Sequence, residues 1–196
     1  MRGEIELLRE LVAIPSVSGS ETELATFLET VARRWGLDVV RDSDGVRVEL
    51  RGFGVGPSLA LVSHLDVVPP GPGWTRDPFV PSIEDNRLYG RGSSDAKASV
   101  AAMLCAAKDL VERGGIDAGR LVLLFGFGEE TRNTSMPAAL EKAGEIEAAV
   151  IGEPTSLNFA IAQRGLLMVD LVAQGTQRHA AYASGNGDFT NATLVL

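Results

Sequence analysis

His64 and Asp66 are the residues of this sequence best suited to chemistry. They follow an apolar run at residues 59–62 that is typical of a buried strand. Residues two apart on a strand point to the same side, so the imidazole and the carboxylate are predicted to share one face. An acid beside a histidine fixes the orientation of a ring that binds a metal ion. The pair therefore indicates a metal-bound histidine held by a carboxylate.

Three further acidic sites follow, each at the end of an apolar segment or just beyond it. Asp95 ends a glycine-rich stretch, and Glu129 and Glu130 follow the apolar run 121–125. Glu153 lies just beyond another apolar segment. In an open α/β sheet such loops gather along one edge, where ligands bind. Because His, Asp and Glu suit zinc, manganese or cobalt, and one of two adjacent glutamates can face the attacking water, the pattern predicts a metal-dependent hydrolase.

Each of these residues alone has a simpler explanation. His64 could be a satisfied structural histidine, and Asp95 could cap a helix at residues 96–113. Glu129 and Glu130 could lie in a solvated loop, and Glu153 could belong to a turn. The occurrence of potential ligands at four strand ends favours the metal site.

Two glycine-rich stretches resemble nucleotide-binding loops only superficially. Residues 52–57 have no following helix or lysine, so they are predicted to form a turn. Residues 90–95 end in Asp instead of Gly and are not closely preceded by a predicted strand. A dinucleotide-binding domain, which would bind NADH and no metal, is therefore the weaker alternative.

The predicted elements alternate between helix and strand, which favours an α/β fold. Helices are expected at residues 4–12, from a capping box formed by Ser20 and Glu23 to Trp35, at 96–113 and near 136–143. Strands are expected at residues 46–50, 58–64, 120–127, 147–151, 158–162 and 166–173. A loop rich in proline and glycine runs from residue 69 to about 86.

Composition excludes several classes of function. The net charge is −8, from 26 acidic and 18 basic residues, and no basic run is interleaved with aromatics, so no nucleic-acid partner is expected. The charged beginning does not resemble a signal peptide, and no apolar run is long enough to span a membrane. The one cysteine, Cys105, fits a reducing compartment and a buried structural thiol. A cytoplasmic location is therefore expected.

Five ordered motifs carry a resemblance to a known family. They are Ser63–Pro69 (SHLDVVP), Trp74–Phe79 (WTRDPF), Tyr89–Lys97 (YGRGSSDAK), Gly128–Glu130 (GEE) and Gly152–Thr155 (GEPT). In order and spacing they resemble the di-zinc metallopeptidase family of acetylornithine deacetylases and succinyl-diaminopimelate desuccinylases, which also includes carboxypeptidase G and aminoacylases. The resemblance covers residues 1–180 and implies a zinc-exopeptidase-like fold, with a mixed central sheet flanked by helices.

The resemblance implies a role for each site residue. His64 and Glu153 would bind one zinc ion and Glu130 the second, while Asp95 would bridge the two; cobalt or manganese could replace zinc. Asp66 would hold the His64 ring, and the Asp95–Ala96 peptide would be cis. Glu129 would be the general base, taking a proton from the attacking water and later passing it to the leaving amine.

The resemblance also implies two domains. Residues 1–163 would form the catalytic domain without its C-terminal part, and residues 164–196 would begin a small α+β lid that mediates homodimerisation. His179 matches a histidine that reaches the partner subunit's active site and stabilises the oxyanion there. Ala180 stands where the family has a serine, so a simple surface position for His179 stays open.

The implied substrate is a small N-acyl amino acid. Residues 152–157 look closest to acetylornithine deacetylases, with desuccinylases or dipeptidases as alternatives. Family members are longer and supply a last metal-binding histidine after the lid. Because this sequence has only two histidines, both already placed, we expect a truncated chain that binds metal and catalyses poorly.

Overall fold

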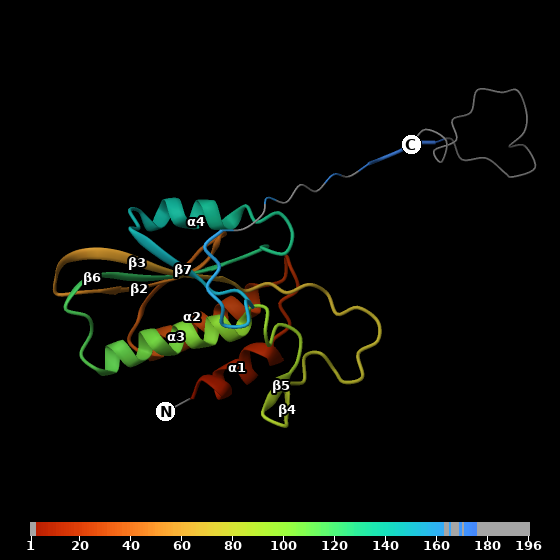
Figure 1. Cartoon of the computed structure of the whole chain (residues 1–196), viewed down its shortest axis with the longest axis horizontal. Helices are drawn as coiled ribbons and strands as arrows, with labels where there is room; N and C mark the ends of the chain where they lie inside the picture. The colour runs from red at the N-terminus through yellow and green to blue at the C-terminus, as the bar shows by residue number, and fades with distance from the viewer. Residues whose placement is uncertain (1–2, 163–164, 166–168, 170, 176–196) are drawn as a thin grey trace, which may run out of the picture. The chain divides into compact units, whose positions relative to one another are not determined.

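The computed structural model describes residues 3–162, 165, 169 and 171–175 (Figure 1). The helices of the described part are α1 (Glu4–Ala13), α2 (Thr22–Arg34), α3 (Lys97–Glu112) and α4 (Ser135–Ala143). Its strands are β1 (Asp38–Arg41), β2 (Gly45–Arg51), β3 (Gly54–His64), β4 (Ser82–Glu84), β5 (Arg87–Tyr89), β6 (Ala118–Gly126) and β7 (Ala148–Ile151). The chain divides into two compact units, residues 1–157 and 158–196, and all these elements belong to the first.

Five strands form one mixed sheet in the order β1-β2-β6-β3-β7. β3 pairs parallel with β6 on one side and with β7 on the other. β2 pairs antiparallel with both β1 and β6. The register places His64 beside Gly126 and Val62 beside Ile151. The carboxyl ends of β3, β6 and β7 therefore meet at one edge of the sheet, and the loops that leave them start there.

Helices cover both faces of this sheet. Figure 1 shows α2 and α3 on one face and α4 on the other, with α1 packed beside α3. Side chains alternate along β6, so Leu121, Leu123 and Phe125 enter the larger core under α1, α2 and α3. Val122 and Leu124 enter a smaller core under α4. Because both faces of β6 are buried, this strand is the continuous apolar run seen in the sequence.

The sequence prediction of a mixed α/β sheet flanked by helices is confirmed, but several local predictions are wrong. The helix α2 begins at Thr22, not at a Ser20 capping box: Glu21 is the N-cap, and the Ser20 amide donates to the Val17 carbonyl in a preceding turn. The short strands β1, β4 and β5 were not expected. Within the described residues 158–162 no strand forms, and Phe159 and Ile161 are fully exposed there.

The expected turn at residues 52–57 is instead mostly strand, because β3 begins at Gly54, which pairs with Ala118, and the register shifts between Gly54 and Ser58. The glycines permit this approach: a Cβ on Gly52 would lie 2.6 Å from the Ala118 Cα, and one on Gly56 would lie 2.8 Å from the Gly119 nitrogen. Half of the predicted strand 166–173 lies outside the described residues, and the described residues 169 and 171–173 are not in a strand. Among the helices of the described part, none is long and apolar enough to cross a membrane.

Candidate metal centre

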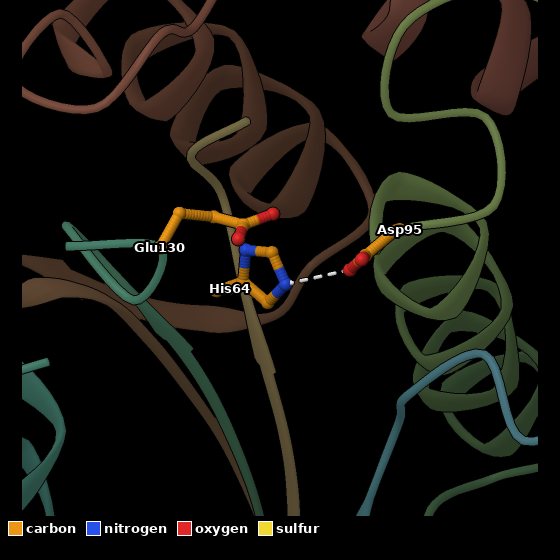
Figure 2. Close-up of side chains that lie close together, drawn as sticks. All are labelled: His64, Asp95 and Glu130. Atoms are coloured by element: carbon orange, nitrogen blue, oxygen red, sulfur yellow. Dashed lines mark hydrogen bonds and ion pairs between the residues drawn. The ribbon is translucent and has the colours of Figure 1, made fainter. Parts of the chain in front are cut away.

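Three of the predicted metal ligands come together at the carboxyl edge of the sheet (Figure 2). His64 is the last residue of β3, Asp95 precedes α3, and Glu130 lies in the loop between β6 and α4. One ligand atom from each residue lies within 4.8 Å of the others. His64 Nε2 and Asp95 Oδ1 are 3.1 Å apart.

Glu153, the fourth predicted ligand, approaches the same histidine from the end of β7. Its Oε1 atom lies 4.0 Å from His64 Nε2. The Gly152 amide donates to the Val62 carbonyl, which fixes the chain as it leaves the sheet. A Cβ on Gly152 would lie 2.6 Å from both Ser99 and Met103, so only glycine allows this close packing against α3. All four predicted ligands thus lie at one edge of the sheet.

The loop that carries Asp95 is fixed by its neighbours. The Asp95–Ala96 peptide is cis, which confirms the expectation drawn from the motif. Ala96, not Asp95, is the N-cap of α3, so the carboxylate is left for other contacts. The Lys97 amide donates to the Gly92 carbonyl, and its buried Nζ donates to the Leu11 carbonyl at 2.9 Å and to a second carbonyl at the end of α1.

Asp66 holds the His64 ring mainly through its backbone. His64 Nδ1 lies 2.9 Å from the Asp66 carbonyl oxygen and 3.5 Å from the Asp66 carboxylate. A carbonyl oxygen only accepts hydrogen bonds, so Nδ1 carries the proton and donates it. When the ring is neutral, its lone pair is therefore on Nε2, the atom that faces Asp95 and Glu153. This tautomer is the one that binds a metal ion through Nε2.

The Asp66 carboxylate is fully buried. It supports the glutamate loop, the connection between β6 and α4 that carries Glu129 and Glu130. Its Oδ1 accepts the Glu129 amide at 2.9 Å, and its Oδ2 accepts the Glu130 amide at 3.0 Å. The Ser18 hydroxyl also donates to Oδ2, at 2.7 Å. Burial raises the pKa of Asp66, but the adjacent His64 ring and the hydrogen bonds from Ser18 and the two amides outweigh burial and lower the pKa overall.

The electrostatics of the cluster fit a bound cation. Burial lowers the pKa of His64, but the carboxylates of Asp66, Glu153 and Asp95 outweigh it and raise the pKa from 6.5 to about 9. Burial raises the pKa values of Glu130 and Glu153, and the negative charge of Asp95 raises both further. Several carboxylates thus repel one another around a single imidazole. Oxygen and imidazole donors in this crowded arrangement suit zinc, cobalt or manganese.

Glu129 lies beside the ligands without being one of the clustered three. Its Oε1 accepts a hydrogen bond of 3.3 Å from the Asn133 side chain, and its charge contributes to the raised pKa of Glu153. Its carboxylate is therefore within electrostatic reach of a predicted metal ligand. His179, the remaining predicted catalytic residue, lies outside the described residues.

Sequence reasoning overlooked two residues of the α1–α2 connection: Glu21, which accepts the Gly128 amide of the glutamate loop, and Ser18, which donates to the Asp66 carboxylate. Both lie in the polar stretch Ser16–Ser20 and its continuation, where a helix start was the simpler interpretation. Lys97 belongs to a recognised motif, but its bonds to α1 link residues more than eighty positions apart. Such long-range contacts leave no periodic signal in a single sequence.

Comparison with known proteins identifies the family. The model of peptidase family M20/M25/M40 matches residues 60–184. The succinyl-diaminopimelate desuccinylase of Sphingopyxis alaskensis is 35% identical over 196 residues, which cover 91% of this chain and 51% of that protein. The desuccinylase of Methylibium petroleiphilum is 42% identical over 164 residues, covering 78% of this chain and 40% of that protein. The chain thus spans about half the length of these relatives.

Solved structures of M20 family peptidases share the fold of this chain. An M20 family metallo-carboxypeptidase from Sulfolobus solfataricus matches with a TM-score of 0.67 and 27% identity, over 78% of this chain and 37% of that one. A dinuclear metal-binding peptidase of the M20 family from Bacillus subtilis shares the fold, with a TM-score of 0.58 and 18% identity, over 76% of this chain and 41% of that one. The family match and the desuccinylase relatives together establish that this chain belongs to peptidase family M20/M25/M40.

Proposed function

We propose that this chain carries the di-metal centre of an amidohydrolase that cleaves the amide bond of N-acyl amino acids. The observation that supports it best is the cluster of His64, Asp95 and Glu130, whose ligand atoms lie within 4.8 Å of one another. Glu153 stands 4.0 Å from the same His64 nitrogen. Membership of the M20 family gives this cluster a chemical context, because the family includes peptidases and desuccinylases.

His64, Asp95, Glu130 and Glu153 would hold two zinc ions, with Asp95 shared between them. Cobalt or manganese would also suit these donors. When bound, such ions supply a Lewis acid for the scissile carbonyl and lower the pKa of water. The protonated Nδ1 of His64, bonded to the carbonyl of Asp66, would keep Nε2 free as a ligand.

Glu129 would act as the proton carrier. Its carboxylate would take a proton from the attacking water and then deliver it to the nitrogen of the leaving amine. The amide hydrogen bonds from Glu129 and Glu130 to Asp66 support this division, because they fix the backbone from which both side chains extend. General base catalysis of this kind contributes about 10²–10⁴-fold to the rate.

For the substrate, we favour N-succinyl-diaminopimelate, since the relatives cited above at 35% and 42% identity are desuccinylases. N-acetylornithine is the second candidate, because residues 152–157 resemble the acetylornithine deacetylase branch. Dipeptides form a third class, supported by the fold similarity to human carnosine dipeptidase 1, with a TM-score of 0.64. The first two substrates imply roles in lysine and arginine biosynthesis respectively.

The division of the chain forms part of the proposal. Residues 1–163 would belong to the catalytic domain, and residues 164–196 would begin a lid through which two copies associate. His179 would then stabilise the oxyanion in the partner's site. A homodimer in which His179→Ala lowers turnover without changing metal affinity would support this assignment. A monomer, or a variant with unchanged turnover, would contradict it.

The test of the main proposal combines metal binding with turnover. The chain, freed of metal by chelation, is titrated with Zn²⁺ and Co²⁺ by calorimetry and assayed with the three substrate classes. We expect Glu129→Gln to bind metal as the wild type does and to lose hydrolysis by about 10²–10⁴-fold. Glu141→Gln, an exposed substitution on α4, is the matched control and should change neither property.

The outcomes separate the candidate functions. A chain that binds no divalent metal ion refutes the metal centre. Metal binding without hydrolysis of any substrate favours the non-catalytic alternative, in which the chain binds metal but does not turn over. Hydrolysis that survives in Glu129→Gln would assign the base to another residue. NADH binding in the absence of metal binding would revive the dinucleotide interpretation, although residues 90–95 follow β5 of a separate two-stranded sheet.

A further inference from the structure

Three consecutive backbone amides in the glutamate loop all donate to buried carboxylates. The Glu129 and Glu130 amides donate to the two oxygens of Asp66. The Gly128 amide donates to Oε1 of Glu21, at 3.1 Å. Glu21 lies 107 positions earlier in the sequence, in the connection between α1 and α2. Two acids from separate segments thus hold one turn.

Glu21 is built into this position and is not a surface acid that happens to lie nearby. The residue is only 5% exposed. Its Oε1 also accepts the Gly19 amide, at 2.9 Å, so one oxygen joins the α1–α2 connection to the glutamate loop. A buried carboxylate is costly unless it is hydrogen-bonded, and these two amides supply such bonds.

Gly128 is the pivot of the turn that bears the two glutamates. Its φ is +63°, a left-handed conformation that favours glycine. Its carbonyl accepts the amides of Thr131 and Asn133 and the Thr131 hydroxyl. The amide side of Gly128 is held by Glu21, and the carbonyl side closes the turn. Releasing the amide would therefore loosen the backbone that carries Glu129 and Glu130.

We propose that Glu21 is a positioning residue for the metal centre, acting through the Gly128 amide to set the places of Glu129 and Glu130. The consequence for metal binding rests on the proposed function, whereas the consequence for the turn does not. Acids that orient metal ligands from outside the ligand set typically change metal affinity or activity by about 10–100-fold when removed.

The experiment measures the turn and the metal separately on the full chain. Amide hydrogen exchange, resolved to residues 126–133, reports the turn, and Co²⁺ titration followed by visible absorption reports the ligands. The variants are Glu21→Ala, which removes the acceptor, and Glu21→Gln, which keeps an oxygen in the same place. Glu23→Ala, an exposed position two residues away, is the matched control. Urea unfolding of each variant measures global stability.

We expect Glu21→Ala to accelerate exchange of the Gly128 amide by about tenfold or more, the effect of losing a hydrogen bond to a charged acceptor. Its Co²⁺ affinity should fall by about 10–100-fold, with a changed cobalt spectrum. Glu21→Gln should restore the slow exchange and the spectrum, and Glu23→Ala should match the wild type. If Glu21→Ala does not fold, Glu21→Asp decides, because its shorter side chain withdraws the carboxylate while keeping the charge.

Unchanged Gly128 exchange in Glu21→Ala would overturn the proposal. So would acceleration spread evenly over the whole chain, since that pattern reports global destabilisation alone. If exchange at Gly128 rises while cobalt affinity and spectrum stay as in the wild type, Glu21 holds the turn but does not position the ligands, and the proposal fails. A wild-type chain that binds no cobalt refutes the proposed metal centre, and the exchange data then decide the effect of Glu21 on the turn.

Discussion

The substitution Asp66→Asn tests how the glutamate loop is held, independently of metal and of turnover. In the wild type the two backbone amides bond to different oxygens: Glu129 N–H to Oδ1 and Glu130 N–H to Oδ2. An asparagine side chain has the same shape but only one oxygen, and its other terminus is a donor. Whichever way the amide group turns, one of the two backbone N–H groups faces another donor.

The expected cost follows from these contacts. A donor left without an acceptor in a buried site costs about 1–3 kcal/mol. The surviving amide bond and the Ser18 bond lose their ionic acceptor, and charge-assisted bonds are roughly twice as strong as neutral ones, which adds about 1 kcal/mol. Because the two amides are only partly buried, we expect a loss of about 2–3 kcal/mol in the free energy of unfolding.

Urea unfolding of the metal-free chain, followed by circular dichroism, measures this loss. Asp109→Asn, the same change at an exposed position on α3, is the control and should stay within about 0.5 kcal/mol of the wild type. The second readout is amide exchange, which should accelerate at either Glu129 or Glu130. A variant with wild-type stability and slow exchange at both amides would show that Asp66 does not hold the loop.

The remaining predictions address the metal, the sheet edge and the thiol. Zn²⁺ at a hundred times its dissociation constant should raise the free energy of unfolding by about 2.7 kcal/mol, and EDTA should reverse this; a metal-independent melting curve would contradict the site. Asp95→Asn should weaken Co²⁺ binding by calorimetry at least about tenfold, since a neutral amide replaces an anionic ligand. Gly152→Ala should cost about 1–3 kcal/mol because its Cβ would meet Ser99 at 2.6 Å, whereas Gly71→Ala, with nothing within 4 Å, should be neutral by the same urea assay. Burial raises the pKa of Cys105 from 9.0 to about 11. At pH 8, alkylation of Cys105 in the folded chain should therefore be at least about a hundredfold slower than in urea. Equal rates would show that the thiol is accessible to solvent in the folded chain.

The sheet could be predicted from the sequence because its central strands are buried on both faces. The runs that became β3 and β6 contain successive apolar residues, and such runs identify a covered strand without any knowledge of its partners. The short strand β1 has only Val39 buried, so its pattern was too weak to detect. The extension of β3 to Gly54 was misjudged because glycine and proline suggest a turn. Here the glycines allow the backbone to pack closely against residues 118–119 of β6. That contact depends on the strand pairing, which the sequence does not show.

The arrangement of the candidate site was accessible for the same topological reason. Parallel strands place their carboxyl ends together, so residues that follow β3, β6 and β7 must approach one another once the strand order is known. The pairing of His64 with Asp66 could also be read locally, since the two residues are two positions apart. The sequence could not show that the Asp66 backbone carbonyl, more than its carboxylate, holds the imidazole.

The two kinds of contact that Asp66 makes, through its carbonyl and through its carboxylate, explain why His64 and the glutamate pair belong to one structural unit. Asp66 directs its carbonyl to the His64 ring and its carboxylate to the amides of Glu129 and Glu130, 63 and 64 positions later. One residue thus fixes a candidate ligand on β3 and the loop that follows β6 at the same time. Shifting Asp66 would move the imidazole and both glutamates together, whereas loss of the Glu21 contact would loosen only the glutamate side. In cobalt spectra the Asp66→Asn and Glu21→Ala variants should therefore both disturb the carboxylate ligand and leave the imidazole in place, because both variants retain the Asp66 backbone carbonyl that holds His64 Nδ1.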